Sequence, residues 1–521
     1  MSQQTDGPDL RDLDRVPDLA ARLRRTALER PDHPALIAGP RTVTYRELHT
    51  RVDAVTAALQ GLGVGPGDRV AIVLGTTVPF VETYAAVLRA GAAFVPLLPG
   101  LAPDELRHAL ADSEVRVAFV GPERASDIAA LRDQLPALEH LIAVEADVEG
   151  ATAYGPLVAG VGEPERVTRD ASDLAALVYT SGTTGRPRGA MLTRGNLAAN
   201  QDQSLAGRFE VTGDDVVLLV LPLAHIYALN VGLGSSVAVG ATMVLVPRFE
   251  PGETLDTIAR QGVTVVLGAP PMYVVWLESG LLERADLSSV RLAVSGAAPL
   301  GVPTLERFAD VTGITIEEGY GLTEASPSVS STSMTPTPVP GTVGSPLPGI
   351  DLRLVDAQGD DVEPGDPGEV WVRGPNVFQG YWHDDQATAD ALTPDGWLRT
   401  GDVGCQDGAG NLRLVDRLRD LIIVSGFNVY PREVERVLVE DPAVAEAASV
   451  GVPHPLTGET VVAYVVPRAD HQVDLDALDD LCRGRLARYK CPSRIEVVPV
   501  LPHTATGKLR RRELRERSAG S

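Results

Sequence analysis

Lysine is almost absent from this chain of 521 residues. It occurs only at Lys490 and Lys508, whereas lysine and arginine together number 46. A sequence that meets nearly every other need for a cation with arginine has kept an ammonium at these positions. Lys508 lies in the turn-forming stretch "TATGKLRRREL". We therefore expect it to have a role that a planar guanidinium does not fill.

Cysteines and long apolar runs are also scarce. The three cysteines, Cys405, Cys482 and Cys491, form no CxxC pair, which argues against a disulfide framework or a zinc site. No apolar run reaches the ~18 residues that a membrane span requires. The acidic, polar start "MSQQTDGPDLRDLDR" is unlike a signal peptide. These absences predict a cytoplasmic protein without a membrane span.

The charge of the chain restricts its partners. A formal net charge of −24 argues against nucleic acid or an anionic membrane, because the field repels polyanions. From Leu481 onwards, however, 11 basic residues against 3 glutamates give a local net charge of +8. This segment is either a solvated basic tail or a docking surface for a phosphorylated ligand, and composition alone does not separate the two.

Short apolar runs alternate with helical patterns along most of the chain. The runs expected to be strands are 69–74, 115–120, 215–223, 241–246, 263–270 and 290–296. Continuous β-branched runs indicate strands buried on both faces, and hence an α/β fold. Past the break at 335–349, "DLRLVD" and "GEVWVRG" predict a small β lobe. The best domain boundary is the charged stretch 414–426, which precedes a small α+β module.

The densest chemistry lies in "LAALVYTSGTTGRPRGAM", residues 174–191. An apolar strand leads into six residues that are each glycine or hydroxyl-bearing: Thr180, Ser181, Gly182, Thr183, Thr184 and Gly185. Glycines let the backbone approach an anion, and hydroxyls and amides donate to it, so this loop is suited to phosphate binding. It is not a Walker A loop, because no Gly-Lys-Ser/Thr follows at the required spacing. Arg188 adds a cation.

This loop resembles the phosphate-loop signature of the AMP-forming adenylating enzymes, which include acyl-CoA synthetases, luciferases and peptide-synthetase adenylation domains. Further segments match that superfamily in the same order: "EEGYGLTE" (317–324), "LRTGDVG" (398–404), "DRLRDLIIVSGFNVYPREVE" (416–435) and "TATGKLRR" (504–511). One departure is Arg188, which stands where the family usually has lysine. Since arginine has displaced lysine nearly everywhere, we interpret it as a tolerated exchange of cations.

The resemblance implies that ATP activates a carboxylic acid to an acyl-adenylate, with release of pyrophosphate, and that the acyl group then passes to coenzyme A. The ATP site implied by the motifs contains Thr180, Ser181, Gly182, Thr183, Thr184, Gly185, Arg188, Ala297, Ala298, Glu318, Gly319, Tyr320, Gly321, Thr323, Asp402 and Arg417. Glu324, with Thr184, would bind Mg²⁺. Tyr320 would stack on adenine, and Asp402 and Arg417 would hold the ribose.

The same resemblance gives Lys508 its role. It would bridge the attacking carboxylate and the α-phosphate, where a compact ammonium fits better than a guanidinium. A large domain (1–416) and a small mobile one (421–521) would be joined by a hinge at 417–420, centred on Arg419.

In the second step the small domain turns. Gly426, Phe427 and Lys490 would then contact CoA. His225 would shield the acyl pocket, although a histidine beside apolar residues can also be simply packed.

The acyl pocket is expected around the stretch "LPLAHIYALNVGLGSS". Its predicted lining is Ile226, Tyr227, Leu229 and Asn230. Amino-acid-activating relatives carry a Phe-Asp pair here, and its absence argues against a free amino acid. Ile226 stands where hydroxybenzoate-activating relatives have asparagine. We therefore favour a medium-chain or long-chain fatty acid. An aryl or arylalkanoate CoA ligase, and an acyl-AMP ligase that loads a carrier protein, remain alternatives.

Overall fold

The computed structural model describes most of the chain. Described are residues 18–160, 162–180, 187–207, 211–425, 427–469, 471–503 and 509–519. The predicted site residues outside these ranges are Ser181, Gly182, Thr183, Thr184, Gly185, Gly426 and Lys508. The roles of these residues stay predictions.

The chain divides into two compact units. Unit 1 contains residues 1–351 and 372–398, and unit 2 contains residues 352–371 and 399–521. The hinge expected at 417–420 lies inside unit 2. The domain limits expected from the sequence, 1–416 and 421–521, stay a prediction.

The first sheet of unit 1 has the strand order β7-β6-β5-β3-β4-β8-β9. Its strands are β3 (Arg69–Val73), β4 (Ala93–Pro96), β5 (Val117–Val120), β6 (His140–Ala143), β7 (Thr152–Ala153), β8 (Leu174–Thr180) and β9 (Arg188–Thr193). Neighbours are parallel except β8 and β9, which are antiparallel. The helices in this part of the chain are α1 (Leu19–Glu29), α2 (Tyr45–Gly61), α3 (Val78–Arg89), α4 (Pro103–Asp112), α5 (Ala125–Ala130) and α6 (Tyr154–Ala159). Strands β4 and β5 are buried along their whole length, as expected for strands covered on both faces.

The second sheet of unit 1 has the order β16-β15-β14-β13-β12-β10-β11-β1-β2. Its strands are β1 (Pro34–Ala38), β2 (Arg41–Thr44), β10 (Val216–Leu219), β11 (Thr242–Leu245), β12 (Val265–Gly268), β13 (Leu292–Ser295), β14 (Ile316–Gly321), β15 (Ser328–Ser331) and β16 (Ser345–Pro346). The associated helices are α7 (Arg194–Leu205), α8 (Ser235–Val239), α9 (Pro251–Gln261), α10 (Pro270–Ser279) and α11 (Val302–Thr312). A further helix, α12 (Asp385–Ala391), follows later in the chain.

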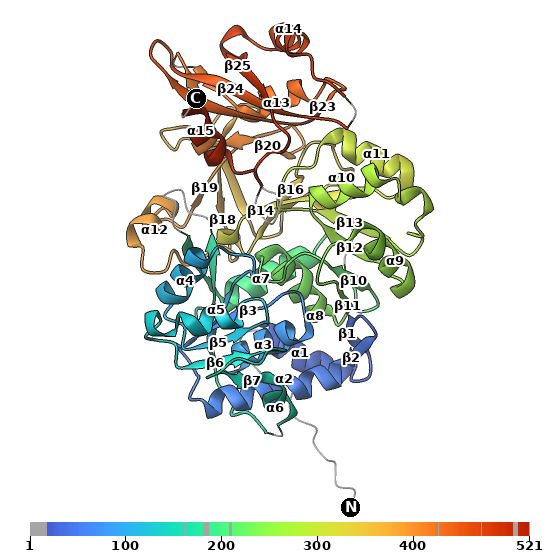
Figure 1. The fold of residues 1–521 in the computed structure, drawn as a ribbon, viewed down its shortest axis with the longest axis vertical. Coiled ribbons are helices and arrows are strands. Elements are labelled where there is room, and N and C mark those ends of the chain that lie inside the picture. The colour runs from blue at the N-terminus through green and yellow to red at the C-terminus, as the bar shows by residue number, and fades with distance from the viewer. Residues whose placement is uncertain are drawn as a thin grey trace, which may run out of the picture. The chain divides into compact units, whose positions relative to one another are not determined.

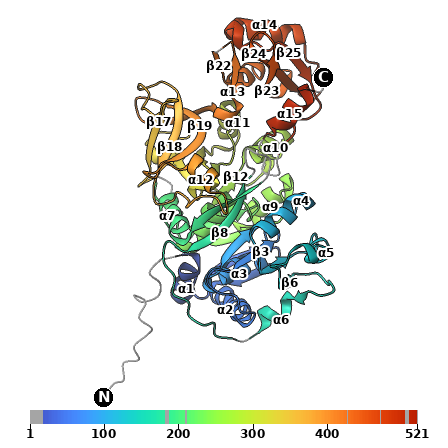
Figure 2. The same ribbon diagram turned by 90° about the vertical axis from the view of Figure 1, so that its left-hand side faces the viewer.

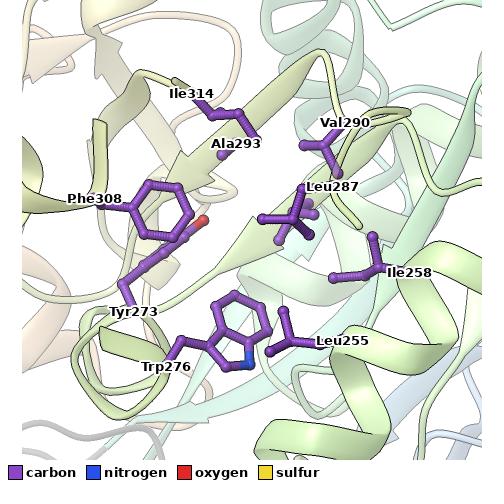
Figure 3. Close-up of a pocket in the computed structure, with 10 residues that line it drawn as sticks. Leu255, Ile258, Tyr273, Trp276, Leu287, Val290, Ala293, Phe308 and Ile314 are labelled. Atoms are coloured by element: carbon purple, nitrogen blue, oxygen red, sulfur yellow. The ribbon is translucent and has the colours of Figure 1, made fainter. Parts of the chain in front are cut away.

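Helices α9, α10 and α11 cover the β12–β13 part of this sheet (Figure 1). Side chains of these helices help to line a cavity of ≈ 10 Å³, with Tyr273, Trp276 and Phe308 on one side (Figure 3). The Tyr273 hydroxyl donates to the carbonyl of Val294 at 2.8 Å, so the lining offers a ligand no unused polar group. A space of this size is a packing void.

Unit 2 contains two smaller sheets. The first has the order β17-β18-β19-β20, with β17 (Asp351–Val355), β18 (Gly368–Arg373), β19 (Leu398–Gln406) and β20 (Leu412–Arg417). The second has the order β22-β21-β24-β23, and β25 also pairs with β24. Its strands are β21 (Ile422–Val424), β22 (Phe427–Val429), β23 (Val444–His454), β24 (Gly458–Pro467) and β25 (Arg494–Val497).

Helices α13 (Pro431–Leu438) and α14 (Leu475–Arg485) pack on one face of this second sheet, and α15 (Arg511–Ala519) packs on the other (Figure 2). Pro431 is the first residue of α13, where its missing N–H costs nothing. The predicted fold class is confirmed: layers of α/β structure and a β lobe precede a smaller α+β part. Within the described ranges, no helix has the length and apolar character to cross a membrane.

Candidate active site

The predicted phosphate loop joins β8 to β9. Thr180 ends β8, Arg188 begins β9, and the two residues face each other across the antiparallel pair. The structure therefore brings the two ends of the loop together at one edge of the first sheet.

Arg188 is partly engaged by the protein itself. Its Nε lies 3.0 Å from Oδ2 of Asp384, the N-cap residue of α12. Its Cζ lies 5.7 Å from the centre of the Tyr381 ring. A guanidinium can pair with a carboxylate and stack on an aromatic face at the same time, whereas an ammonium has no flat face to stack. These contacts give a physical reason for arginine at this position.

Glu324 lies directly after β14, in the short helix η5 (Thr323–Ala325). Its Oε1 accepts a hydrogen bond of 2.7 Å from the Tyr381 hydroxyl. No group of three or more His, Cys, Asp or Glu side chains in the described ranges could hold a metal. A site with one carboxylate suits Mg²⁺, which takes its other ligands from phosphates and water.

Strand β14 carries the predicted adenine segment, and Tyr320 on it is buried. A Cβ on Gly321 would lie 2.0 Å from the carbonyl oxygen of Pro327. A Cβ on Gly319 would meet nothing closer than 3.8 Å. The protein's own backbone therefore requires glycine at 321, whereas no neighbouring atom requires it at 319.

Glu318, also on β14, is a buried carboxyl. Burial raises its pKa to about 7, although the backbone N–H of Leu300 opposes this by donating to Oε1 at 3.3 Å. Near neutral pH this side chain is thus divided between its neutral and charged forms.

The loop after β13 contains Ala297 and Ala298. Ala297 has a φ of +70°, in the left-handed region that non-glycine residues rarely adopt. A Cβ on the preceding Gly296 would lie 3.1 Å from the ring of Tyr227. The backbone of this loop therefore lies directly against the predicted acyl pocket.

Three predicted acyl residues, Tyr227, Leu229 and Asn230, lie on a π-helix, η3 (Tyr227–Gly234), and Ile226 is its N-cap residue. His225 precedes it, and its Nδ1 accepts from the backbone N–H of Tyr227 at 3.3 Å. Ile226 and Leu229 are buried. The Asn230 amide is used inside the protein: it donates to the carbonyls of Leu197 and Ser326 and accepts from Gln201. Its predicted contact with an acyl group remains untested.

Two buried hydroxyls beside Gly296 lack partners. Tyr227 is 8% exposed and Ser295 is 2% exposed. Among the described residues, neither hydroxyl has a hydrogen-bond partner. Burial raises the pKa of Tyr227, so its hydroxyl remains a neutral donor. Buried polar groups in native proteins are nearly always paired, so these two require an explanation.

Asp402 and Arg417 lie opposite each other on β19 and β20 of unit 2. The Nε of Arg417 is 2.9 Å from Oδ1 of Asp402, whose side chain is only 6% exposed. The two residues predicted to hold the ribose are thus adjacent.

The predicted hinge, with Arg419 in the short helix η7 (Leu418–Asp420), is anchored at both ends. Asp416 accepts from the backbone N–H of Arg432 in α13 at 2.9 Å. Asp420 lies 3.0 Å from Nη2 of Arg515 in α15. The side chain just before the predicted hinge, at 416, and that of its last residue, at 420, are therefore held by other elements of unit 2.

The predicted CoA residues Phe427 and Lys490 lie near Tyr489. The rings of Phe427 and Tyr489 stack at 4.7 Å. The ammonium of Lys490 lies 2.8 and 2.7 Å from the two carboxylate oxygens of Glu433. A CoA contact by Lys490 remains a prediction.

Carboxylates of unit 2 pair with part of the positive charge of the basic C-terminal segment. Arg511, for example, pairs with Glu435 and Asp420. The carboxylates that contact arginines of this segment are Asp420, Glu435, Glu440, Asp479, Glu496, Glu513 and Glu516. Asp420, Glu435, Glu440 and Asp479 lie outside the segment, so these pairs offset its net charge of +8 only in part.

Sequence reasoning missed Tyr381 and Asp384. Tyr381 lies in the segment "NVFQGYW" (376–382) and Asp384 just after it. The segment has neither the period of a helix nor that of a strand, and no local signal marks the contacts with Glu324 and Arg188. The π-helix was also missed, because its apolar sequence resembles any buried segment.

Comparison with protein-family models matches residues 23–382 to the AMP-binding enzyme and residues 433–508 to the AMP-binding enzyme C-terminal domain. A feruloyl-CoA synthase of Amycolatopsis sp is 40% identical over 495 residues, which cover 95% of this chain and 97% of that protein. A long-chain-fatty-acid–CoA ligase of Bacillus subtilis (strain 168) is 36% identical over 524 residues, covering 95% and 93%.

Solved structures agree with these matches. ATP-bound MatB from Rhodopseudomonas palustris has a TM-score of 0.89 and 34% identity, covering 96% of this chain and 99% of that one. The anthranilate CoA ligase AuaEII in complex with anthranoyl-AMP has a TM-score of 0.89 and 28% identity, covering 98% and 99%.

Proposed function

The chain belongs to the AMP-binding enzyme family, among its AMP-forming acyl-CoA ligases, and we propose that its substrate is an aromatic carboxylic acid with a polar ring substituent. In this reaction the acid attacks the α-phosphate of ATP, pyrophosphate leaves, and the thiol of CoA then displaces AMP. ATP, Mg²⁺ and CoA are the cofactor and co-substrates.

The observation that carries the choice of acid is the buried Tyr227 hydroxyl, which has no hydrogen-bond partner in the described part of the chain. Leaving such a group unpaired costs about 1–3 kcal/mol. A hydroxyl or methoxy oxygen on a bound aromatic ring would supply the missing partner, whereas an alkyl chain would not. Ser295, the residue before Gly296, has a second buried hydroxyl with no hydrogen-bond partner among the described residues. The feruloyl-CoA synthase, at 40% identity, supports the same class of acid.

The residues of the site have separable tasks in this proposal. Asp402 and Arg417 bind the ribose of ATP. Lys508 holds the attacking carboxylate against the α-phosphate, where preorganised positive charge stabilises the transition state. Arg419 is the pivot about which the C-terminal part turns before thioester formation.

The metal site fits the chemistry of Mg²⁺. Glu324 supplies a carboxylate whose Oε1 is held by Tyr381, and a hydroxyl of Thr184 is the second expected ligand. When bound, the ion neutralises phosphate charge.

A fatty acid is the second candidate. The apolar side chains of Ile226 and Leu229 suit an alkyl tail, and relatives named as long-chain-fatty-acid–CoA ligases are 35–36% identical. In that case the Tyr227 hydroxyl would stay unpaired with substrate bound.

Pyrophosphate release with a panel of acids separates the candidates. We expect ferulate to give the highest kcat/KM, with cinnamate, which lacks ring oxygens, about 10-fold lower. Tyr227→Phe should remove that difference. A preference for octanoate or palmitate would favour the fatty-acid candidate. Product mass with and without CoA tests the acceptor, and adenylate that never becomes acyl-CoA would indicate an acyl carrier protein instead.

A further inference from the structure

Residues 374–382, here called the strap, run beside β9, the strand that leaves the phosphate loop. The backbone N–H of Met191 donates to Gly380 at 2.9 Å, and that of Gln379 donates back to Met191 at 3.0 Å. Trp382 donates to Gly189 at 2.8 Å. The strap is therefore fixed in register to the first strand after the loop.

The strap also holds the backbone around Glu324. The N–H of Phe378 donates to the carbonyl of Glu324 at 2.9 Å. The buried amide of Asn376 donates to the carbonyl of Ala325 at 2.8 Å. The strap thus connects the start of β9, just after the phosphate loop, to the predicted metal ligand Glu324. These three parts of the chain lie far apart in the sequence.

Tyr381, at the end of the strap, is held on several sides. Its ring packs edge-on against Phe378 at 5.0 Å, and the Arg188 guanidinium lies over its face. Its hydroxyl donates to Oε1 of Glu324 at 2.7 Å.

The contact with Tyr381 makes the two oxygens of Glu324 unequal. Oε1 accepts from the phenol, whereas Oε2 accepts no hydrogen bond from the described residues. An oxygen that already accepts a strong hydrogen bond is a poorer metal ligand. The metal ion would therefore be bound by Oε2 and not by Oε1. Mg²⁺ at 2.0–2.1 Å suits a single oxygen, whereas the larger Ca²⁺ readily takes both oxygens of a carboxylate.

We propose that Tyr381 is a positioning residue that confines Glu324 to one-oxygen coordination and so favours Mg²⁺ over Ca²⁺ at the nucleotide. This inference rests on the proposed function, because it takes Glu324 as the metal ligand. Its test, however, needs no acid substrate and reads no product.

The experiment is calorimetric titration of ATP into the full-length enzyme, without any carboxylic acid, in excess Mg²⁺ or excess Ca²⁺. Removing a group that orients a metal ligand typically costs 10–100-fold in metal affinity. We expect Tyr381→Phe to weaken ATP binding about 10-fold in Mg²⁺. In Ca²⁺ the loss should be below about 3-fold, because the freed carboxylate can then bind through both oxygens.

Tyr154→Phe is the matched control. Its hydroxyl also donates to a buried carboxylate, that of Glu82, outside the candidate site. Both variants lose one phenol–carboxylate bond, so both should lower the melting temperature, but only Tyr381→Phe should change the ratio of the two affinities.

A double-mutant cycle tests whether Tyr381 acts through Glu324. In a Glu324→Gln background, Tyr381→Phe should weaken binding no further in Mg²⁺. Equal losses in Mg²⁺ and Ca²⁺, no loss in either, or an undiminished loss in the Gln background would each overturn the inference. A parent enzyme that binds no ATP in Mg²⁺ would instead refute the proposed function.

Discussion

Replacing Glu318 with glutamine should make the enzyme's stability less dependent on pH. Burial raises the pKa of this carboxyl from 4.5 to about 7, so the folded state favours the protonated form. This preference for protonated Glu318 stabilises the folded state fully below about pH 4.5, and the stabilisation is lost as the pH rises through about 7. The full shift in the pKa of Glu318 corresponds to about 3 kcal/mol in the free energy of unfolding.

Glutamine is neutral at every pH and keeps an oxygen for the N–H of Leu300. The difference in unfolding free energy between Glu318→Gln and the parent should therefore grow by about 2.5 kcal/mol between about pH 5 and about pH 8, in favour of the variant. Urea unfolding of both proteins at each pH measures this difference, and all other titrating groups cancel in the subtraction. A difference that stays constant over this range would show that Glu318 is not held neutral by burial.

Three further changes test other parts of the site. Gly321→Ala should destabilise the protein by about 3 kcal/mol or more, because its Cβ would lie 2.0 Å from a backbone oxygen, whereas Gly319→Ala should melt like the parent; equal melting of the two would contradict the backbone explanation. Arg417→Met should lower thermal stability by about 3 kcal/mol, since it removes the cation beside the buried carboxylate of Asp402; an unchanged melting temperature would mean that the pair adds nothing. Lys508→Arg should slow adenylation roughly 10²-fold yet leave thioester formation from synthetic acyl-adenylate near the parent rate; normal adenylation would make the lysine an accident of composition.

The fold was predictable from the sequence where burial requires a recognisable local pattern of apolar residues. Strands covered on both faces need continuous apolar residues, and the predicted runs at 69–74 and 241–246 became β3 and β11. The pair Asp402 and Arg417 was also expected to act together, and the register of β19 and β20 places them side by side.

Other features depend on contacts between remote segments. Tyr381 and Glu324 are 57 positions apart in the sequence, and the residues around each of them do not predict their hydrogen bond. Gly321 is required by a carbonyl that reaches it only after the chain turns back. The basic C-terminal segment is a further example. Counting its charges in the sequence predicts a positive surface, but the sequence does not show that Arg511 pairs with Asp420 and Glu435 in the folded unit.

The pairing of Lys490 with Glu433 has a practical consequence for chemical labelling. Amine-directed reagents meet two lysines in this chain, and the Lys490 ammonium, with 19% of its side chain exposed, is held by both oxygens of one carboxylate. It must leave that carboxylate before it can react. A label found at Lys490 by mass spectrometry would therefore count molecules in which this pair has opened, in a protein where most other cations are arginines that such reagents ignore.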